Sequence, residues 1–438
     1  MAGKKFKIGV ALLFLLVVGL LAGLRWNYGV TMERAWAAKL DQLRRTGNPM
    51  TLSELAPPPV PDNENAAVLY QQAFVLLNSL PEKTQRRLGD LIDQKAPLTP
   101  KEVEEARSLL VSGEQVLKLV RQGASRSRCL FPIDYSAPAY NLPLHHLAHL
   151  GGSLIPLKVS WRVNLAEDKA DEAVADVVTM LRVAQGVHNE PVVLSAEYEV
   201  MSTESALKKL EKTLEDTEPS RKALKDVSDA LGNISDRGGY VRAARGELCL
   251  VLSVIDMGLK GRLPDQSQGL WERLILVVGR PWHIEMFLPD VDIACEWHTL
   301  VEKPMHESGA GWDAQVKKME TLVTKERVAP ISGMTVFAMR SVANCFDRGV
   351  ARKSCAKLAI ALRLYRMKNG EYPQALSLLA PDFVDKLPVD PFSGKDFIYR
   401  REGSGFVVYS VGPNMTDNGG VEDAKNRDAG DIVWKCAR

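Results

Sequence analysis

The sequence predicts a mainly α-helical protein with a membrane anchor at its N-terminus and a small α+β unit at its C-terminus. Three patterns lead to this prediction. Near residue 8 the chain enters an uninterrupted apolar stretch. Through most of residues 63–368 apolar side chains recur at helical spacing. Past residue 370 the apolar side chains alternate with polar ones or form short continuous stretches beside glycine-rich turns, which is typical of strands.

Length and composition are those of a globular protein with more than one core. The 438 residues exceed what a single hydrophobic core usually serves, and 46% of them are hydrophobic. A formal net charge of +2 without a long basic run provides no electrostatic footprint for nucleic acid, so we expect no such partner. The predicted segments are a cytoplasmic N-terminus (1–7), a transmembrane helix (8–26), a juxtamembrane helix with a proline-rich linker (27–62), an α-helical domain (63–333), and a long helix with the α+β unit (334–438).

The stretch Ile8–Leu24 is uncharged and mostly apolar. As a helix rising about 1.5 Å per residue it spans about 25 Å, close to the thickness of the hydrocarbon core of a bilayer. Lys4, Lys5 and Lys7 precede it and favour a cytoplasmic N-terminus, whereas Trp26 suits the opposite interface. We therefore expect a single-pass protein of the bacterial inner membrane, held in the lipid bilayer through 8–24, with most of the chain in the periplasm. A cleaved signal peptide is the alternative.

Start and stop signals mark individual helices in the predicted helical domain. Asn63–Tyr70 opens one helix, and Thr99–Glu102 combines a cap, a proline in the first turn and a capping box. Leu144–Ala166 and Lys169–Val187 are expected to form a helix pair joined by a short charged turn. Further helices are expected at 195–214, 221–231 and 240–257.

The C-terminal unit begins with a long amphipathic helix, expected from about Met334 to Lys368 and followed by the stop signal Asn369-Gly370. The segments Asp396–Arg401 and Phe406–Ser410 then predict a β-hairpin with a turn of three or four residues. Trp434 is expected to fill the core of this unit and fasten the tail.

The order of motifs in residues 351–438 resembles a known family. The helix ending Ala361-Leu362 with Tyr365 is followed by Gly370-Glu371-Tyr372-Pro373, Leu387-Pro388-Val389-Asp390-Pro391, the hairpin, Ser410-Val411-Gly412 and Asp431-Ile432-Val433-Trp434. This series resembles the C-terminal part of the type II secretion major pseudopilins. The N-terminal stretch lacks the glutamate-containing start of a pilin, so the resemblance implies a pseudopilin-like module joined to an anchored helical protein.

In the pseudopilins, the loop between the S-x-G and D-I motifs binds calcium through carboxylates and main-chain carbonyls. The resemblance implies a calcium site here, and its candidate ligands are Val411, Asn414, Asp417, Glu422, Asp423, Asp428 and Asp431. Calcium takes about six to eight oxygen ligands, so the set is large enough. Because Lys425 and Arg427 lie in the same loop, a charge-balanced loop without an ion is the alternative.

Two clusters in the helical region could carry chemistry. His145 and His149 share a helix face four residues apart, a spacing that can chelate a transition metal. An ordinary cluster of helix-packing histidines is the alternative. Glu197, Glu199 and Glu204 could form a paired-carboxylate site, but we interpret them as a solvated acidic face of one helix.

The sequence contains no G-x-S-x-G motif, no phosphate-binding glycine loop and no C-x-x-C pair. We therefore predict a non-catalytic function, that of a membrane-anchored periplasmic scaffold or interaction protein with a calcium-stabilised pseudopilin-like module. Envelope or secretion proteins are the candidate partners. The alternative is an exported metal-dependent hydrolase whose site lies in the helical domain and uses His145 and His149.

Overall fold

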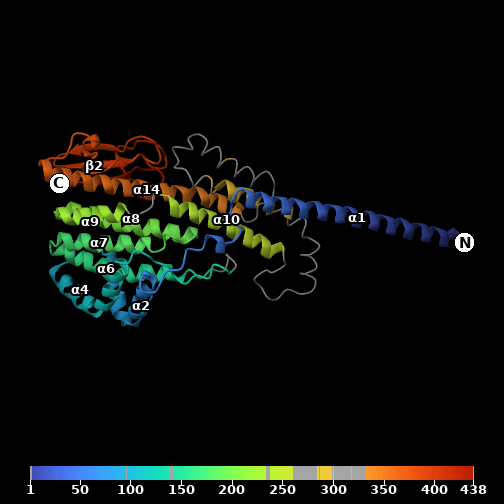
Figure 1. Ribbon diagram of the computed structural model, residues 1–438, viewed down its shortest axis with the longest axis horizontal. Helices are drawn as coiled ribbons and strands as arrows, with labels where there is room; N and C mark the ends of the chain where they lie inside the picture. The colour runs from blue at the N-terminus through green and yellow to red at the C-terminus, as the bar shows by residue number, and fades with distance from the viewer. Residues whose placement is uncertain are drawn as a thin grey trace.

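The chain is mainly helical, with a long helix at its N-terminus and a small antiparallel sheet near its C-terminus (Figure 1), which confirms the predicted fold class. The computed structural model describes residues 2–94, 96–137, 142–232, 237–259, 284–285, 287–297, 299, 317 and 332–437. The elements are α1 (Ala2–Arg45), η1 (Leu52–Leu55), α2 (Ala66–Ser79), α3 (Glu82–Asp93), α4 (Pro100–Ser112), α5 (Glu114–Ala124), α6 (His145–Ala166), α7 (Ala170–Gln185), α8 (Val193–Asp216), α9 (Arg221–Gly232), α10 (Gly238–Leu259), α14 (Ser332–Asn369), η3 (Leu376–Leu379), β1 (Ile398–Glu402), β2 (Gly405–Ser410) and β3 (Ile432–Cys436).

α1 extends away from the rest of the molecule (Figure 1). It is the one helix among the described residues that is long and apolar enough to cross a membrane, although a signal sequence passes the same test. Leu20 and Leu21 on this helix are exposed, as is Trp26. The segments predicted as a transmembrane helix and a juxtamembrane helix form one continuous helix, since no proline interrupts residues 2–45.

The helices from α2 to α9 pack in successive layers (Figure 1), and α7 contacts α6, α8 and α9. Local signals place their ends as expected. The Asn65 side chain accepts a hydrogen bond from the Ala67 amide and caps α2. Thr99 and Glu102 form the predicted capping box at the start of α4, and Gly113 separates α4 from α5.

α14 lies between the layered helices and the sheet (Figure 1). It contacts α8 and α9 as well as β2, β3 and η3. Ala356, Ala359 and Ala361 are almost fully buried in it, and such small side chains allow close approach from more than one direction. As a result, one hydrophobic cluster runs without interruption from α2 to β3.

The three strands form one antiparallel sheet in the order β1-β2-β3. Glu402 pairs with Gly405, so the hairpin turn has two residues rather than the three or four expected. The shorter turn is possible because Gly403 has a φ of +58°, a conformation that glycine adopts without strain. Trp434 on β3 pairs with Val408 and is fully buried, which confirms its expected place in the core.

Asp390 explains why two of the sequence motifs occur together. Its buried carboxylate accepts hydrogen bonds from the Ser410 hydroxyl at 2.7 Å and from the Ser393 hydroxyl at 2.8 Å. The L-P-x-D-P and S-x-G motifs therefore meet in space. Gly412 completes the junction: its φ is +70°, and a Cβ atom there would lie 2.4 Å from the Gly430 carbonyl oxygen.

Candidate functional site

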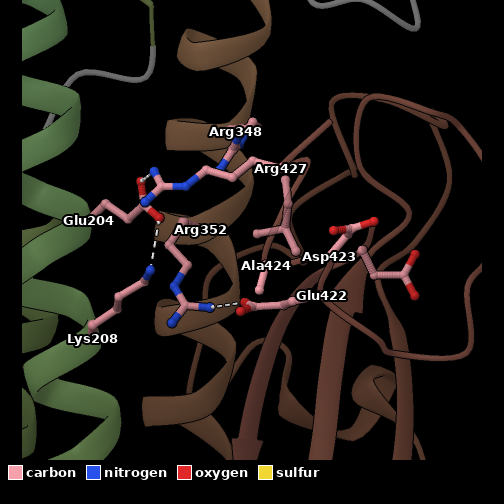
Figure 2. Close-up of a pocket in the computed structure, with 10 residues that line it drawn as sticks. Glu204, Lys208, Arg348, Arg352, Glu422, Asp423, Ala424 and Arg427 are labelled. Carbon is pink, nitrogen blue, oxygen red and sulfur yellow. Dashed lines mark hydrogen bonds and ion pairs between the residues drawn. The ribbon is translucent and has the colours of Figure 1, made fainter. Parts of the chain in front are cut away.

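A charged cavity of about 240 Å³ lies where α8, α14 and the loop 421–431 meet (Figure 2). Its lining comprises Glu204 and Lys208 from α8, Arg348 and Arg352 from α14, and Glu422, Asp423, Ala424, Arg427, Asp431 and Ile432 from the loop and the start of β3. Neither the layered helices nor the C-terminal unit forms this cavity alone. It is therefore the candidate site that depends on both.

Arg352 is the buried cation of this cavity. Its guanidinium donates hydrogen bonds to the Val433 carbonyl and to the Glu211 carboxylate, and Nη1 lies 3.3 Å from Oε1 of Glu422. The guanidinium carbon is also 5.3 Å from the ring centroid of Trp434, within cation–π distance. One side chain thus joins α8, α14, β3 and the loop.

Glu211 on α8 links the same elements from the opposite side. Its carboxylate contacts Arg352 and also accepts a hydrogen bond from the Lys435 amide at 2.9 Å. Burial raises the pKa of this carboxyl, and the Arg352 guanidinium opposes that rise. The arginine is therefore what stabilises a negative charge at this partly buried position.

The outer part of the cavity is closed by longer ion pairs. Arg348 lies 3.5 Å from Asp428, and Glu204 pairs with both Lys208 at 3.4 Å and Arg427 at 3.5 Å (Figure 2). The lining contains four cations, Lys208, Arg348, Arg352 and Arg427, and four acids, Glu204, Glu422, Asp423 and Asp431. Charges of the two signs are matched, so the cavity has no surplus charge with which to attract a small ion.

Asp431, a candidate calcium ligand, already serves the fold of its own loop. Its carboxylate is buried and accepts hydrogen bonds from the amides of Gly420 at 2.7 Å, Asn418 at 3.2 Å and Val421 at 3.3 Å. Three backbone N–H groups donate to this carboxylate, in the way that backbone N–H groups surround a bound anion. These contacts close the loop without an ion.

Other candidate carboxylates are occupied in the same way. Asp417 accepts hydrogen bonds from the Tyr409 hydroxyl at 2.9 Å and the Gly419 amide at 2.8 Å. Asp423 accepts hydrogen bonds from the amides of Asn426 and Lys425, which lower the pKa of its carboxyl. Each acid therefore faces its own local donors instead of a shared centre.

The remaining candidates take different positions. Glu422 and Asp428 pair with arginines of α14, as described above. The Asn414 side chain donates a hydrogen bond to the Ala429 carbonyl at 2.7 Å, and Val411 is buried with its amide toward Asp390. Among the residues that the structure describes, no three His, Cys, Asp or Glu side chains gather as they would around a metal ion. The calcium site stays a prediction.

The three histidines of α6 lie on different faces of the helix, two exposed and one buried. His145 and His149 are exposed, and the His149 ring lies 5.3 Å from that of Phe74. His146 is buried, stacked on Phe131 at 4.5 Å. No third metal ligand joins His145 and His149 within the described part of the chain. These contacts favour the alternative of helix-packing histidines.

A buried polar network around Glu190 had no signal in the sequence. Its carboxylate lies 2.9 Å from Nε2 of His146 and also accepts a hydrogen bond from the Ser195 hydroxyl. All three side chains are buried. Because the serine donates to the glutamate and not to the histidine, the histidine is not placed to take the serine's proton. The network therefore serves packing between the ends of α6 and α8.

The interpretation of Glu199 as part of a solvated acidic face is wrong. Its side chain is buried, and its carboxylate lies 3.0 Å from Nδ1 of His188 in the connection between α7 and α8. The partner histidine compensates for the loss of water, which is why an acid is tolerated there. Glu247 on α10 has a different environment, because burial followed by repulsion from Glu197 raises the pKa of its carboxyl to about 7.

No protein-family model, curated protein or solved structure matches this chain. Function is therefore inferred from the geometry of the described residues.

We predict that Arg352→Ala lowers the free energy of unfolding by about 3 kcal/mol, because it leaves the partly buried Glu211 carboxylate without its partner. Urea denaturation of the full chain measures this change. Arg348→Ala, one turn earlier on α14, is the matched control: its partner Asp428 is 42% exposed, so the expected loss is below about 1 kcal/mol. Equal losses for the two variants would contradict the central role of Arg352.

We also predict that Glu247 makes stability depend on pH. The folded protein keeps the proton on this carboxyl up to a pKa of about 7, whereas the unfolded chain releases it near 4.5, so the free energy of unfolding falls as pH rises between these values. Glu247→Gln should remove this fall and stabilise the protein by about 3 kcal/mol at pH 8, with little effect at pH 4.5. Urea denaturation at both pH values tests this, with the exposed Glu104→Gln as control. A gain of the same size at both pH values would rule out titration of Glu247 as the cause.

Proposed function

We propose that this protein is a membrane-anchored scaffold or interaction protein of the bacterial envelope. In this proposal α1 lies in the inner membrane, and the layered helices and the sheet-bearing unit lie in the periplasm. The observation that carries the proposal is the packing of the end of α1 against the rest of the molecule. A scaffold needs such an attachment because it must hold its surfaces in a fixed orientation to the membrane.

The attachment is formed by the last turns of α1. Leu43 is buried against Leu248, Val251 and Ile255 of α10, and Trp36 packs on the edge of the same cluster. These contacts bury apolar area, each well-buried leucine contributing about 2 kcal/mol. Polar contacts add to them: Lys39 pairs with Asp292, and the Arg245 guanidinium donates a hydrogen bond to the Gly47 carbonyl at 2.7 Å.

The chemistry of the described clusters supports a non-catalytic role. The acids and bases of the charged cavity neutralise one another, and the Glu190 network is closed to solvent. The alternative of a metal-dependent hydrolase rests on His145 and His149, which have no third ligand among the described residues. A helix carrying a three-stranded sheet supports the pseudopilin-like interpretation of residues 351–438, and secretion proteins remain the proposed partners.

For the loop 411–431 we propose the charge-balanced alternative. Arg348 and Arg352 neutralise Asp428 and Glu422, and backbone amides satisfy Asp417, Asp423 and Asp431. An ion would have to displace these contacts before it could collect the same oxygens. The free energy of calcium binding would therefore be offset by the loss of these hydrogen bonds and ion pairs.

We expect the full chain to stay with membranes after a carbonate wash, and a variant lacking residues 2–24 to move to the soluble fraction. Proteinase added to spheroplasts should digest the body of the protein, since it lies outside the inner membrane in this proposal. N-terminal sequencing of the mature protein provides the control. A new N-terminus near residue 25, or a body protected from the proteinase, would contradict the proposed anchoring.

We expect calcium to leave the free energy of unfolding within about 0.5 kcal/mol of its value in excess chelator. A calcium site with a Kd of about 10⁻⁴ M would instead add about 1.4 kcal/mol to the free energy of unfolding at about 1 mM calcium, by mass action. Hydrogen exchange of residues 405–434 with and without chelator localises any difference. A calcium-dependent increase in protection that Asp431→Asn abolishes would restore the calcium site.

A further inference from the structure

A groove separate from the charged cavity runs between α6 and α8. It encloses about 230 Å³. Its walls are formed by Gly151, Leu154 and Lys158 of α6 and by Tyr198, Met201, Ser202, Ser205 and Ala206 of α8, with Met180 of α7 among them. Gly151 and Leu154 of α6 lie at the same end of the groove as Tyr198 of α8. Lys158 and Ser205 lie further along the two helices. The groove therefore has an apolar end and a polar end.

The apolar end is kept open by a glycine. A Cβ atom at Gly151 would lie 4.0 Å from the Tyr198 ring, so any larger side chain would project into the groove. Leu154 is buried in the wall, whereas Met201 is 64% exposed at the rim. Methionine is flexible and adapts to apolar ligands of different shape. This end therefore suits an aliphatic chain.

The polar end of the groove is lined by Lys158, and Lys209 lies next to it through its contact with the lining residue Ser205. Lys209 Nζ lies 3.4 Å from the hydroxyl and the carbonyl oxygen of Ser205 and 5.5 Å from the centroid of the Trp161 ring. Within the described part of the chain, neither Lys158 nor Lys209 forms an ion pair. Arg162, whose charge also acts on Lys209, donates hydrogen bonds to backbone carbonyls, Leu91 and Gln94 among them, and the acid that acts on it is Glu102.

These neighbouring positive charges act most strongly on Lys209. Burial, followed by repulsion from Lys158, Arg162 and Lys208, lowers the pKa of its ammonium to about 8. Burial also lowers the pKa of Lys158, where Asp93 acts in the opposite direction. Lys158 and Lys209 are thus two partly desolvated positive charges that repel each other. A bound anion would reduce this repulsion.

We propose that this groove binds a single-chain amphiphile with an anionic head, with the chain between Gly151, Leu154 and Met201 and the head between Lys158 and Lys209. The volume of about 230 Å³ lies below the range of about 300–1,000 Å³ of pockets for larger ligands, which suits one short chain. The charge complementarity selects an anionic head over a neutral one. This inference goes beyond the scaffold function and does not depend on it.

The experiment uses the full chain in lipid nanodiscs and sodium octanoate as the probe. The rate of reductive methylation of each lysine is followed by mass spectrometry at fixed pH. At about ten times its Kd, octanoate should slow the modification of Lys158 and Lys209 about tenfold, because only the unliganded fraction reacts. Lys212, on α8 and 49% exposed, is the internal control and should react at an unchanged rate.

Two further probes separate the head from the chain. Acetate has the head alone and octyl glucoside has a chain with a neutral head, so neither should protect the lysines at the concentration used for octanoate. Gly151→Leu, which fills the apolar end, should abolish protection by octanoate while both lysines stay in place. Protection of the wild-type lysines by acetate or octyl glucoside equal to that by octanoate would overturn the proposal, as would no protection by octanoate.

Discussion

The two-sided burial of α14 is the constraint on which the rest of the structure depends. One face of this helix supports α8 and α9, and the other supports the sheet. A helix buried on two sides must be apolar or small around most of its circumference, and any charge on it must find a partner. Arg352 and Arg363 both meet this requirement: Arg352 reaches carboxylates of α8 and the loop, and Arg363 donates to the carbonyls of Leu214 and Thr217 and pairs with Glu218.

Charge compensation explains how the C-terminal loop is held. Its acids are numerous enough for a cation, yet backbone amides and the arginines of α14 already satisfy them. The same α8 that supplies Glu211 to this junction supplies Lys209 to the groove on α6, where neither it nor Lys158 forms an ion pair within the described residues. One helix thus borders a neutralised junction and a groove with surplus positive charge. This contrast separates a structural contact from a place that favours a ligand.

α1 and the rest of the molecule are joined by packing, so the direction of α1 is related to the orientation of the helices that follow it. Leu43 and Trp36 contact α10, and the uninterrupted core continues from α2 to β3. A flexible linker between anchor and body would let the body turn freely, whereas this junction restrains it. The groove between α6 and α8 consequently keeps a defined direction relative to α1.

The sequence by itself determined the features that depend on neighbours along the chain. Capping at Thr99, the long helix ending at Asn369, the hairpin and the apolar α1 all follow from local propensity and periodicity. Only the tertiary structure decided which acids are paired. Glu199 lies on an apparently solvated helix but is buried against His188, and Glu211 meets an arginine far away in the chain. Burial and charge compensation depend on distant segments, which no local pattern encodes.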